Sequence, residues 1–100
     1  MITVRREWLA KEGKAFEALD NAKAYCKNFD PSSSWRIYRP KSGSMYAIII
    51  EEDYESLADS EEKWSERTKG PNWEAWILEW QRVAVENTFV VNYLDLYCSS

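Results

Sequence analysis

Residues 45–52 limit the fold more than any other segment, because both faces of the strand they would form are apolar. One face of this predicted strand carries Tyr46, Ile48 and Ile50, and the other carries Met45, Ala47 and Ile49. Neither face suits water, so a sheet built around this strand needs cover on both sides. Helices of the same chain can cover one side, and we expect a second subunit to cover the other.

The period of the apolar residues changes once before this strand and predicts a strand followed by a helix. Residues 2–9 alternate between apolar and polar, with Arg6 interrupting the apolar parity, which is typical of a strand facing a core. From about Gly13 the apolar residues recur at intervals of three and four, which predicts a helix that ends at residues 30–33. Its predicted inner face consists of Phe16, Leu19, Ala22, Cys26 and Phe29.

Two further strands and two further helices follow. Residues 34–39 form a short strand candidate, and the loop at 40–43 joins it to 45–52 as a hairpin. Asp53 is predicted to cap a helix that continues to Lys69, where Gly70-Pro71 stops it. The next helix, about 72–85, has the strongest periodicity in the chain, and its inner face carries Trp73, Trp76, Ile77, Trp80, Val83 and Ala84.

Residues 87–97 return to a strand pattern, again with apolar residues on both faces. The predicted order is strand, helix, strand, strand, broken helix, strand. This order is that of an α+β domain of ferredoxin-like βαββαβ type, with a four-stranded antiparallel sheet and the second helix broken at Gly70-Pro71. One hundred residues fit a single domain, 1–100.

Charge and hydropathy exclude two classes of partner. The formal net charge is −4 and the basic residues are scattered, so we expect no nucleic acid to bind. The first seven residues carry charge where a signal peptide needs apolar residues, and no run reaches the ~18 apolar residues of a membrane span. We therefore expect no membrane partner and a cytoplasmic location. Cys26 is interpreted as a core residue and Cys98 as an exposed thiol near the chain end.

Two segments resemble a known family. Residues 4–14, VRREWLAKEGK, look like the first strand and Gly-Lys turn of NIPSNAP-like proteins in the dimeric α/β-barrel superfamily, and residues 54–59, YESLAD, are similar to the family's entry into the helix after the hairpin. The resemblance implies that two four-stranded sheets pack face to face in a homodimer and close a barrel, with a cavity between sheet and helices in each subunit. The superfamily includes cofactor-independent monooxygenases such as the antibiotic-biosynthesis-monooxygenase-like proteins, lactone isomerases and many members with no assigned activity.

The sequence contains no histidine, which removes the usual general base near neutral pH and the usual haem and zinc ligand. No cofactor and no metal site are predicted, and no catalytic residue is identified. The acidic cluster at residues 51–55 is interpreted as a solvated run of charge at a helix start, where acidic residues complement the helix dipole, rather than as a site for a divalent cation.

The candidate ligand-binding residues are mostly aromatic. Trp76 and Trp80, with Trp64 on the preceding helix, either line a pocket for an aromatic substrate or simply pack a helix on a sheet. One of three arginines, Arg39, Arg36 or Arg6, is a candidate anchor for an anionic ligand, and a solvated or salt-bridged arginine is the competing interpretation. Tyr93, on the last strand, completes the set.

Two functional hypotheses follow from this set. The first is a homodimeric domain that binds a small molecule, including the case of a cofactor-independent enzyme, monooxygenase-like or isomerase-like, acting on an aromatic or lipophilic metabolite in a Trp-lined cavity. The alternative is a non-catalytic structural or interaction protein in which the aromatic residues only fill a core.

Overall fold

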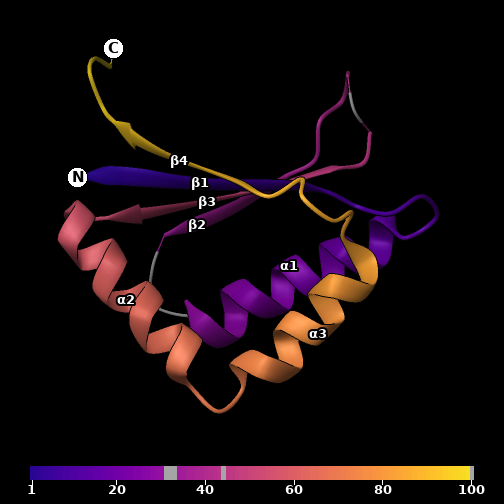
Figure 1. Ribbon diagram of the computed structural model, residues 1–100. Coiled ribbons are helices and arrows are strands. Elements are labelled where there is room, and N and C mark those ends of the chain that lie inside the picture. The colour runs from indigo at the N-terminus through magenta and orange to yellow at the C-terminus, as the bar shows by residue number, and fades with distance from the viewer. Residues whose placement is uncertain (31–33, 44, 100) are drawn as a thin grey trace.

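The computed structural model describes residues 1–30, 34–43 and 45–99, and its elements follow the predicted order. These elements are β1 (Ile2–Leu9), α1 (Ala15–Phe29), β2 (Trp35–Tyr38), β3 (Ala47–Tyr54), α2 (Leu57–Lys69), α3 (Trp73–Val83) and β4 (Val90–Asp95). The strands form an antiparallel sheet in the order β2-β3-β1-β4, and the three helices lie on one face of it (Figure 1). The predicted ferredoxin-like α+β fold is confirmed.

Strand alternation decides which side chains meet the helices. β1 and β3 pair with Arg6 opposite Ile50, so the even-numbered residues of both strands share the helix-covered face. Val4, Ile48 and Ile50 on this face are almost completely buried. β4 is an edge strand that pairs only with β1 among the described strands, and most of its side chains remain exposed.

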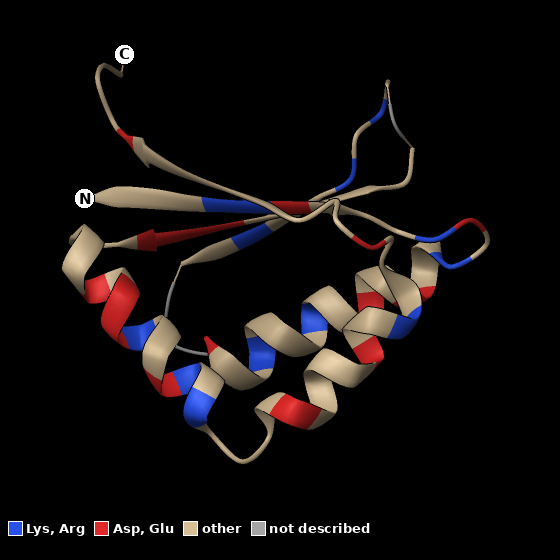
Figure 2. Cartoon of the chain, in the orientation of Figure 1, with Lys and Arg blue, Asp and Glu red and all other residues tan. Residues whose placement is uncertain are grey.

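The inner face of α1 differs from the predicted one. Phe16 was expected in the core but is 73% exposed, with the Arg39 guanidinium 5.4 Å from the centre of its ring. Ala22 and Cys26 are buried as predicted, and Leu19 and Phe29 pack against the core while partly buried. The other buried residues of α1 are Ala18, Asn21 and Tyr25. α1 packs against α3 as well as against the sheet, so its buried face extends to Asn21 and Tyr25. In Figure 2 the first half of α1 carries acidic residues and the second half basic ones, which complements the helix dipole.

The strand predicted at 45–52 lies two residues later, at Ala47–Tyr54. Asp53 is therefore a strand residue and not the predicted helix cap. Ser56 caps α2 instead, because its Oγ accepts a hydrogen bond from the Asp59 N–H at 3.1 Å. The helix break at Gly70-Pro71 is confirmed, since α2 ends at Lys69 and α3 begins at Trp73. The prediction for residues 31–33 lies outside the described part of the chain.

The sheet face away from the helices is mixed rather than uniformly apolar. On β1 it carries Thr3, Arg5 and Glu7 before the apolar Leu9, while the other apolar residues of this face come from β2, from β3 and from the β4 region. Ile49 is 8% exposed, whereas Val90, Leu94 and Leu96 are 47%, 43% and 69% exposed. None of the helices described is long and apolar enough to cross a lipid bilayer.

Candidate functional site

A cavity of about 190 Å³ lies between the sheet and helices α2 and α3. Most of its wall is aromatic. The lining residues are Arg6, Trp8, Tyr25, Ile50, Trp64, Trp73, Trp76, Ile77, Trp80 and Phe89. Five of the six tryptophans of the chain therefore border one space.

Three elements bring the five indoles together. The indoles of α3 recur at intervals of three and four, so Trp73, Trp76 and Trp80 share one helix face, while β1 contributes Trp8 and α2 contributes Trp64. The rings meet at varied angles: Trp64 and Trp73 cross at 77° with centroids 5.3 Å apart, whereas Trp73 and Trp76 are tilted by 37°. The Trp76 Nε1–H donates to the Asn21 carbonyl at 2.9 Å, which fixes that ring.

Two of the indoles have unpaired donors. Within the described residues, neither Trp8 Nε1 nor Trp80 Nε1 has a hydrogen-bond partner, and both atoms are buried. Their rings cross at 69°, and Trp80 and Phe89 cross at 90°, so each of the two indoles packs against other aromatic rings. Buried indole N–H groups usually find an acceptor. The aromatic wall of the cavity therefore contains two buried N–H groups without a hydrogen-bond acceptor among the described residues.

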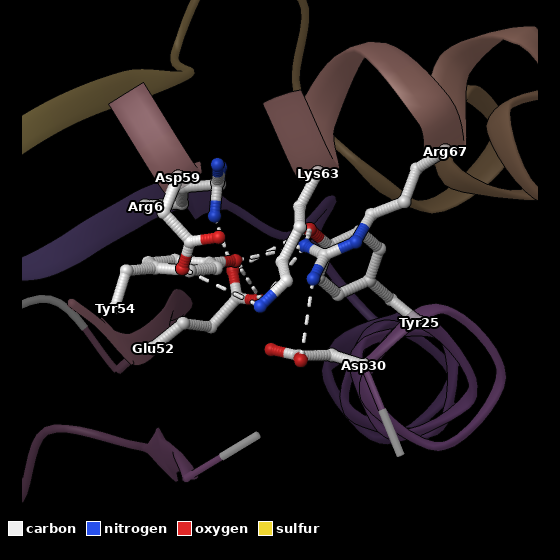
Figure 3. Close-up of polar contacts among 8 residues, drawn as sticks. All are labelled: Arg6, Tyr25, Asp30, Glu52, Tyr54, Asp59, Lys63 and Arg67. Atoms are coloured by element: carbon white, nitrogen blue, oxygen red, sulfur yellow. Dashed lines mark hydrogen bonds and ion pairs between the residues drawn. The ribbon is translucent and has the colours of Figure 1, made fainter. Parts of the chain in front are cut away.

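A buried polar cluster lies beside the cavity, centred on Glu52, which is 0% exposed (Figure 3). Arg67 Nη1 donates to Glu52 Oε2 at 3.0 Å, to the Tyr25 hydroxyl at 2.7 Å and to the Tyr54 hydroxyl at 2.9 Å. The Tyr54 hydroxyl donates to Glu52 Oε2 at 2.9 Å. Arg67 Nη2 also pairs with Asp30 Oδ1 at 3.2 Å. One guanidinium of α2 thus ties the sheet to α1.

The titratable groups of this cluster are not poised for proton transfer near neutral pH. Burial, and then the negative charge of Glu52, raise the pKa of Tyr25 and raise that of Tyr54 to about 12. Burial also raises the pKa of Cys26 to about 12. Burial alone would raise the pKa of Glu52, but its hydrogen bonds and the charges of Arg6 and Arg67 hold that pKa below its usual value. Glu52 is therefore an ionised carboxylate whose oxygens already have donors.

Arg6 joins the cluster to the cavity. Its Nη1 donates to Glu52 Oε1, and its guanidinium lies 4.5 Å from the centre of the Trp64 ring. A neighbouring depression of about 270 Å³ is lined by Arg6, Ser60, Glu61, Trp64, Phe89, Val91 and Tyr93. This depression, named the mouth below, shares Arg6, Trp64 and Phe89 with the cavity.

The structure brings together four of the five predicted ligand-binding residues. Trp64, Trp76 and Trp80 line the cavity, and Tyr93 lines the mouth. Arg39 lies apart from them, after β2 and beside Phe16. That a ligand contacts the three tryptophans and Tyr93 stays a prediction.

Sequence reasoning missed the polar cluster. The run 51–55 was interpreted as solvated, and this is wrong for Glu52, which is buried, and for Asp53, which pairs with Arg36 at 2.8 Å on the opposite sheet face. The sequence did contain a signal for the burial of Glu52, because this residue continues the alternation of Ile48 and Ile50 on the inner face of the strand. Across the described residues, no group of three or more acidic or cysteine side chains is arranged to hold a metal ion.

Comparison with solved structures places the fold among known proteins. A NIPSNAP domain protein from Burkholderia xenovorans matches at a TM-score of 0.84 with 14% identity, over 100% of both chains. A NIPSNAP family protein from Agrobacterium tumefaciens matches at 0.78 with 18% identity, over 93% of this chain and 90% of that one. An antibiotic biosynthesis monooxygenase matches at 0.72 with 9% identity, over 98% and 100%. No family model and no curated protein matches the sequence. At these identities the likeness establishes a shared fold.

Proposed function

We propose that this chain is a homodimeric domain that binds a small aromatic or lipophilic metabolite in the Trp-lined cavity. The observation that carries the proposal is a space of about 190 Å³ walled by five indoles. Protein interiors are normally close-packed, so a gap among so many large rings is unusual. An apolar cavity of roughly 150 Å³ is known to accept benzene, so this one fits a single ring with a small substituent.

The described side chains favour binding over acid–base catalysis by the protein. Tyr25 is the cavity-lining residue with a hydroxyl, and burial raises its pKa above the usual value. Glu52 is ionised, but Arg6, Arg67 and Tyr54 occupy its oxygens. An enzymatic form of the proposal, cofactor-independent oxygenation or isomerisation, would draw on the reactivity of the bound ring itself. The monooxygenase named among the structural neighbours supports that form at the level of fold.

The homodimer is supported by the apolar part of the open sheet face. Val90 and Leu94 point to the face that no described helix covers, and each is close to half exposed. Val90 and Leu94 form an apolar strip along β4, and Tyr38 and Ile49 form a second apolar patch on the same face, with Glu7 of β1 between Val90 and Ile49. A second copy that presents the same strip would bury it around a twofold axis.

Titration with small aromatic compounds tests the cavity. We expect toluene and ethylbenzene to change the intrinsic tryptophan fluorescence saturably and to raise the melting temperature, because a ligand that binds only the folded state stabilises it. Native mass spectrometry of protein purified under mild conditions would identify a ligand retained from the host. Fluorescence and melting that stay unchanged up to the solubility limit of both compounds would favour the alternative, a structural or interaction protein.

Leu94→Asp tests the dimer interface, with Leu78→Asp as its matched control. Both leucines are exposed in the single chain, at 43% and 59%, but Leu94 lies on the open sheet face and Leu78 on α3. We expect light scattering to show a dimer for the wild type and for Leu78→Asp, and a monomer for Leu94→Asp, because an unpaired charge is costly in an apolar interface. A wild-type monomer at micromolar concentration would contradict the homodimer.

A further inference from the structure

Arg6 stands at the boundary between the cavity and its mouth. It is one of three residues that line both spaces, with Trp64 and Phe89. The residue is only 5% exposed, and its guanidinium is stacked 4.5 Å from the centre of the Trp64 ring. A ligand that places its ring among the indoles would bring any substituent that points toward the mouth close to this guanidinium.

Arg6 keeps unused hydrogen-bond donors in this position. A guanidinium carries five N–H groups, and within the described part of the chain the hydrogen bond that Arg6 makes runs from Nη1 to Glu52. The buried, unpaired side-chain nitrogens in that part belong to Arg5, Trp8 and Trp80. Nε and Nη2 of Arg6 are not among these sealed atoms, so they keep access to space while lacking a protein acceptor. A ligand oxygen would complete their hydrogen bonding.

The remaining contacts hold Arg6 in place before any ligand arrives. Glu52 anchors Nη1, and Arg67 and Tyr54 in turn fix Glu52 at 3.0 Å and 2.9 Å. Trp64 covers one face of the guanidinium. Little side-chain freedom is left to lose when a ligand binds, which favours affinity.

Charge selects a neutral oxygen over an anionic one. Arg6 and Arg67 share the carboxylate of Glu52, and Arg67 also pairs with Asp30, so two acidic side chains face the two guanidinium groups. Glu61, a second acidic residue, lines the mouth beside Arg6. A carboxylate ligand would bring a further negative charge close to Glu52 and Glu61, and the one cation among the residues lining these two spaces, Arg6, already pairs with Glu52. A carbonyl or phenol oxygen accepts the same hydrogen bonds without that penalty.

We infer that Arg6 is the ligand's polar anchor and that the ligand is a neutral single-ring aromatic ketone, aldehyde or phenol, rather than a hydrocarbon or an aromatic acid. The inference rests on the proposed function, because it assigns the ring to the same cavity. It adds a donor, an orientation with the oxygen toward the mouth, and a class of ligand.

Three compounds of similar shape test this inference with the wild-type protein. They are acetophenone, α-methylstyrene, which replaces its carbonyl with a carbon–carbon double bond, and benzoate. We expect acetophenone to bind more tightly than benzoate, and the infrared C=O stretch of bound acetophenone to lie well below its frequency in hydrocarbon solvent. Tighter binding of benzoate, or a bound carbonyl that vibrates as in hydrocarbon, would overturn the inference.

A pair of variants then isolates Arg6. Removing Arg6 alone would strand Glu52, so the comparison is between Glu52→Gln and the double variant Arg6→Met/Glu52→Gln, both checked for folding by thermal unfolding. From the single to the double variant, we expect the affinity ratio of acetophenone to α-methylstyrene to fall by about tenfold or more, as loss of a charged hydrogen bond implies. α-Methylstyrene itself should bind both variants alike.

The outcomes separate this inference from the proposed function. If both compounds bind and the ratio is the same in the two variants, the cavity is a binding site and Arg6 is not its anchor. If neither acetophenone nor α-methylstyrene binds the wild type, the proposed function fails and the assignment of Arg6 fails with it.

Discussion

The two ends of the layer between sheet and helices differ in how completely they are filled. At the polar end, Glu52 is 0% exposed and receives hydrogen bonds from Arg6, Arg67 and Tyr54. At the aromatic end, the same two central strands border a cavity of about 190 Å³, and the Trp8 Nε1–H has no partner among the described residues. The polar end, with its hydrogen bonds complete, holds the helices to the sheet, and the aromatic end leaves room for a ligand.

The largest effect is expected from breaking the polar end. Arg67→Leu removes the guanidinium that reaches Glu52, Tyr25 and Tyr54, and leaves a buried carboxylate with one cationic partner fewer. Breaking a buried ion pair on one side typically destabilises by about 3–5 kcal/mol. Urea unfolding followed by tryptophan fluorescence measures the loss.

The control for this variant lies on the same helix. Lys63→Ala removes an exposed ion pair with Asp59, 3.4 Å long, and such pairs contribute about 0.5 kcal/mol or less. If Arg67→Leu is no worse than Lys63→Ala, the polar end does not hold the helices to the sheet, and the contrast between the two ends disappears.

The next effect comes from adding volume at each end. Ile77 lines the cavity, so Ile77→Phe should fill it, leave stability unchanged or slightly higher, and abolish binding of toluene. Ala22 is 0% exposed in a filled part of the core, so Ala22→Leu should destabilise by about 1–3 kcal/mol. The same urea experiment and a toluene titration measure both. Equal destabilisation by the two variants would mean that the cavity has no room to spare.

Sequence periodicity was sufficient for the fold but not for the site. The stripe of Trp76 and Trp80 shows its helical spacing within a few residues, so α3 and its inner face were predictable. Burial of Glu52 depends instead on Arg67, 15 positions later, and on Arg6, 46 positions earlier. Acidic residues after an apolar strand look like a helix start, which moved the predicted strand two residues toward the N-terminus. The cavity depends on how aromatic rings from several elements pack together, so no local sequence pattern predicts it.

The smallest effect concerns an ion pair one residue away from Glu52. Asp53 lies on the open sheet face, where its hydrogen bonds with Arg36, and then with Thr3, lower its pKa from 3.8 to about 2. A carboxyl group whose pKa is lowered by folding adds stability above pH 4, and this contribution is lost as the pH falls toward 2. Because the Arg36 side chain is 36% exposed, solvent weakens the pair, and Asp53→Asn should lose only about 1 kcal/mol at pH 7.

The pH dependence of this loss distinguishes the open face from the buried polar end. Urea unfolding of the wild type and Asp53→Asn at pH 7, 4 and 3 should show the difference shrinking as Asp53 is protonated. The ion pairs of two neighbouring carboxylates on one strand would then differ severalfold in their contribution to the free energy of unfolding, because Glu52 is buried from water while Asp53 keeps contact with it. A loss at pH 7 as large as that of Arg67→Leu would show that burial is not what separates them.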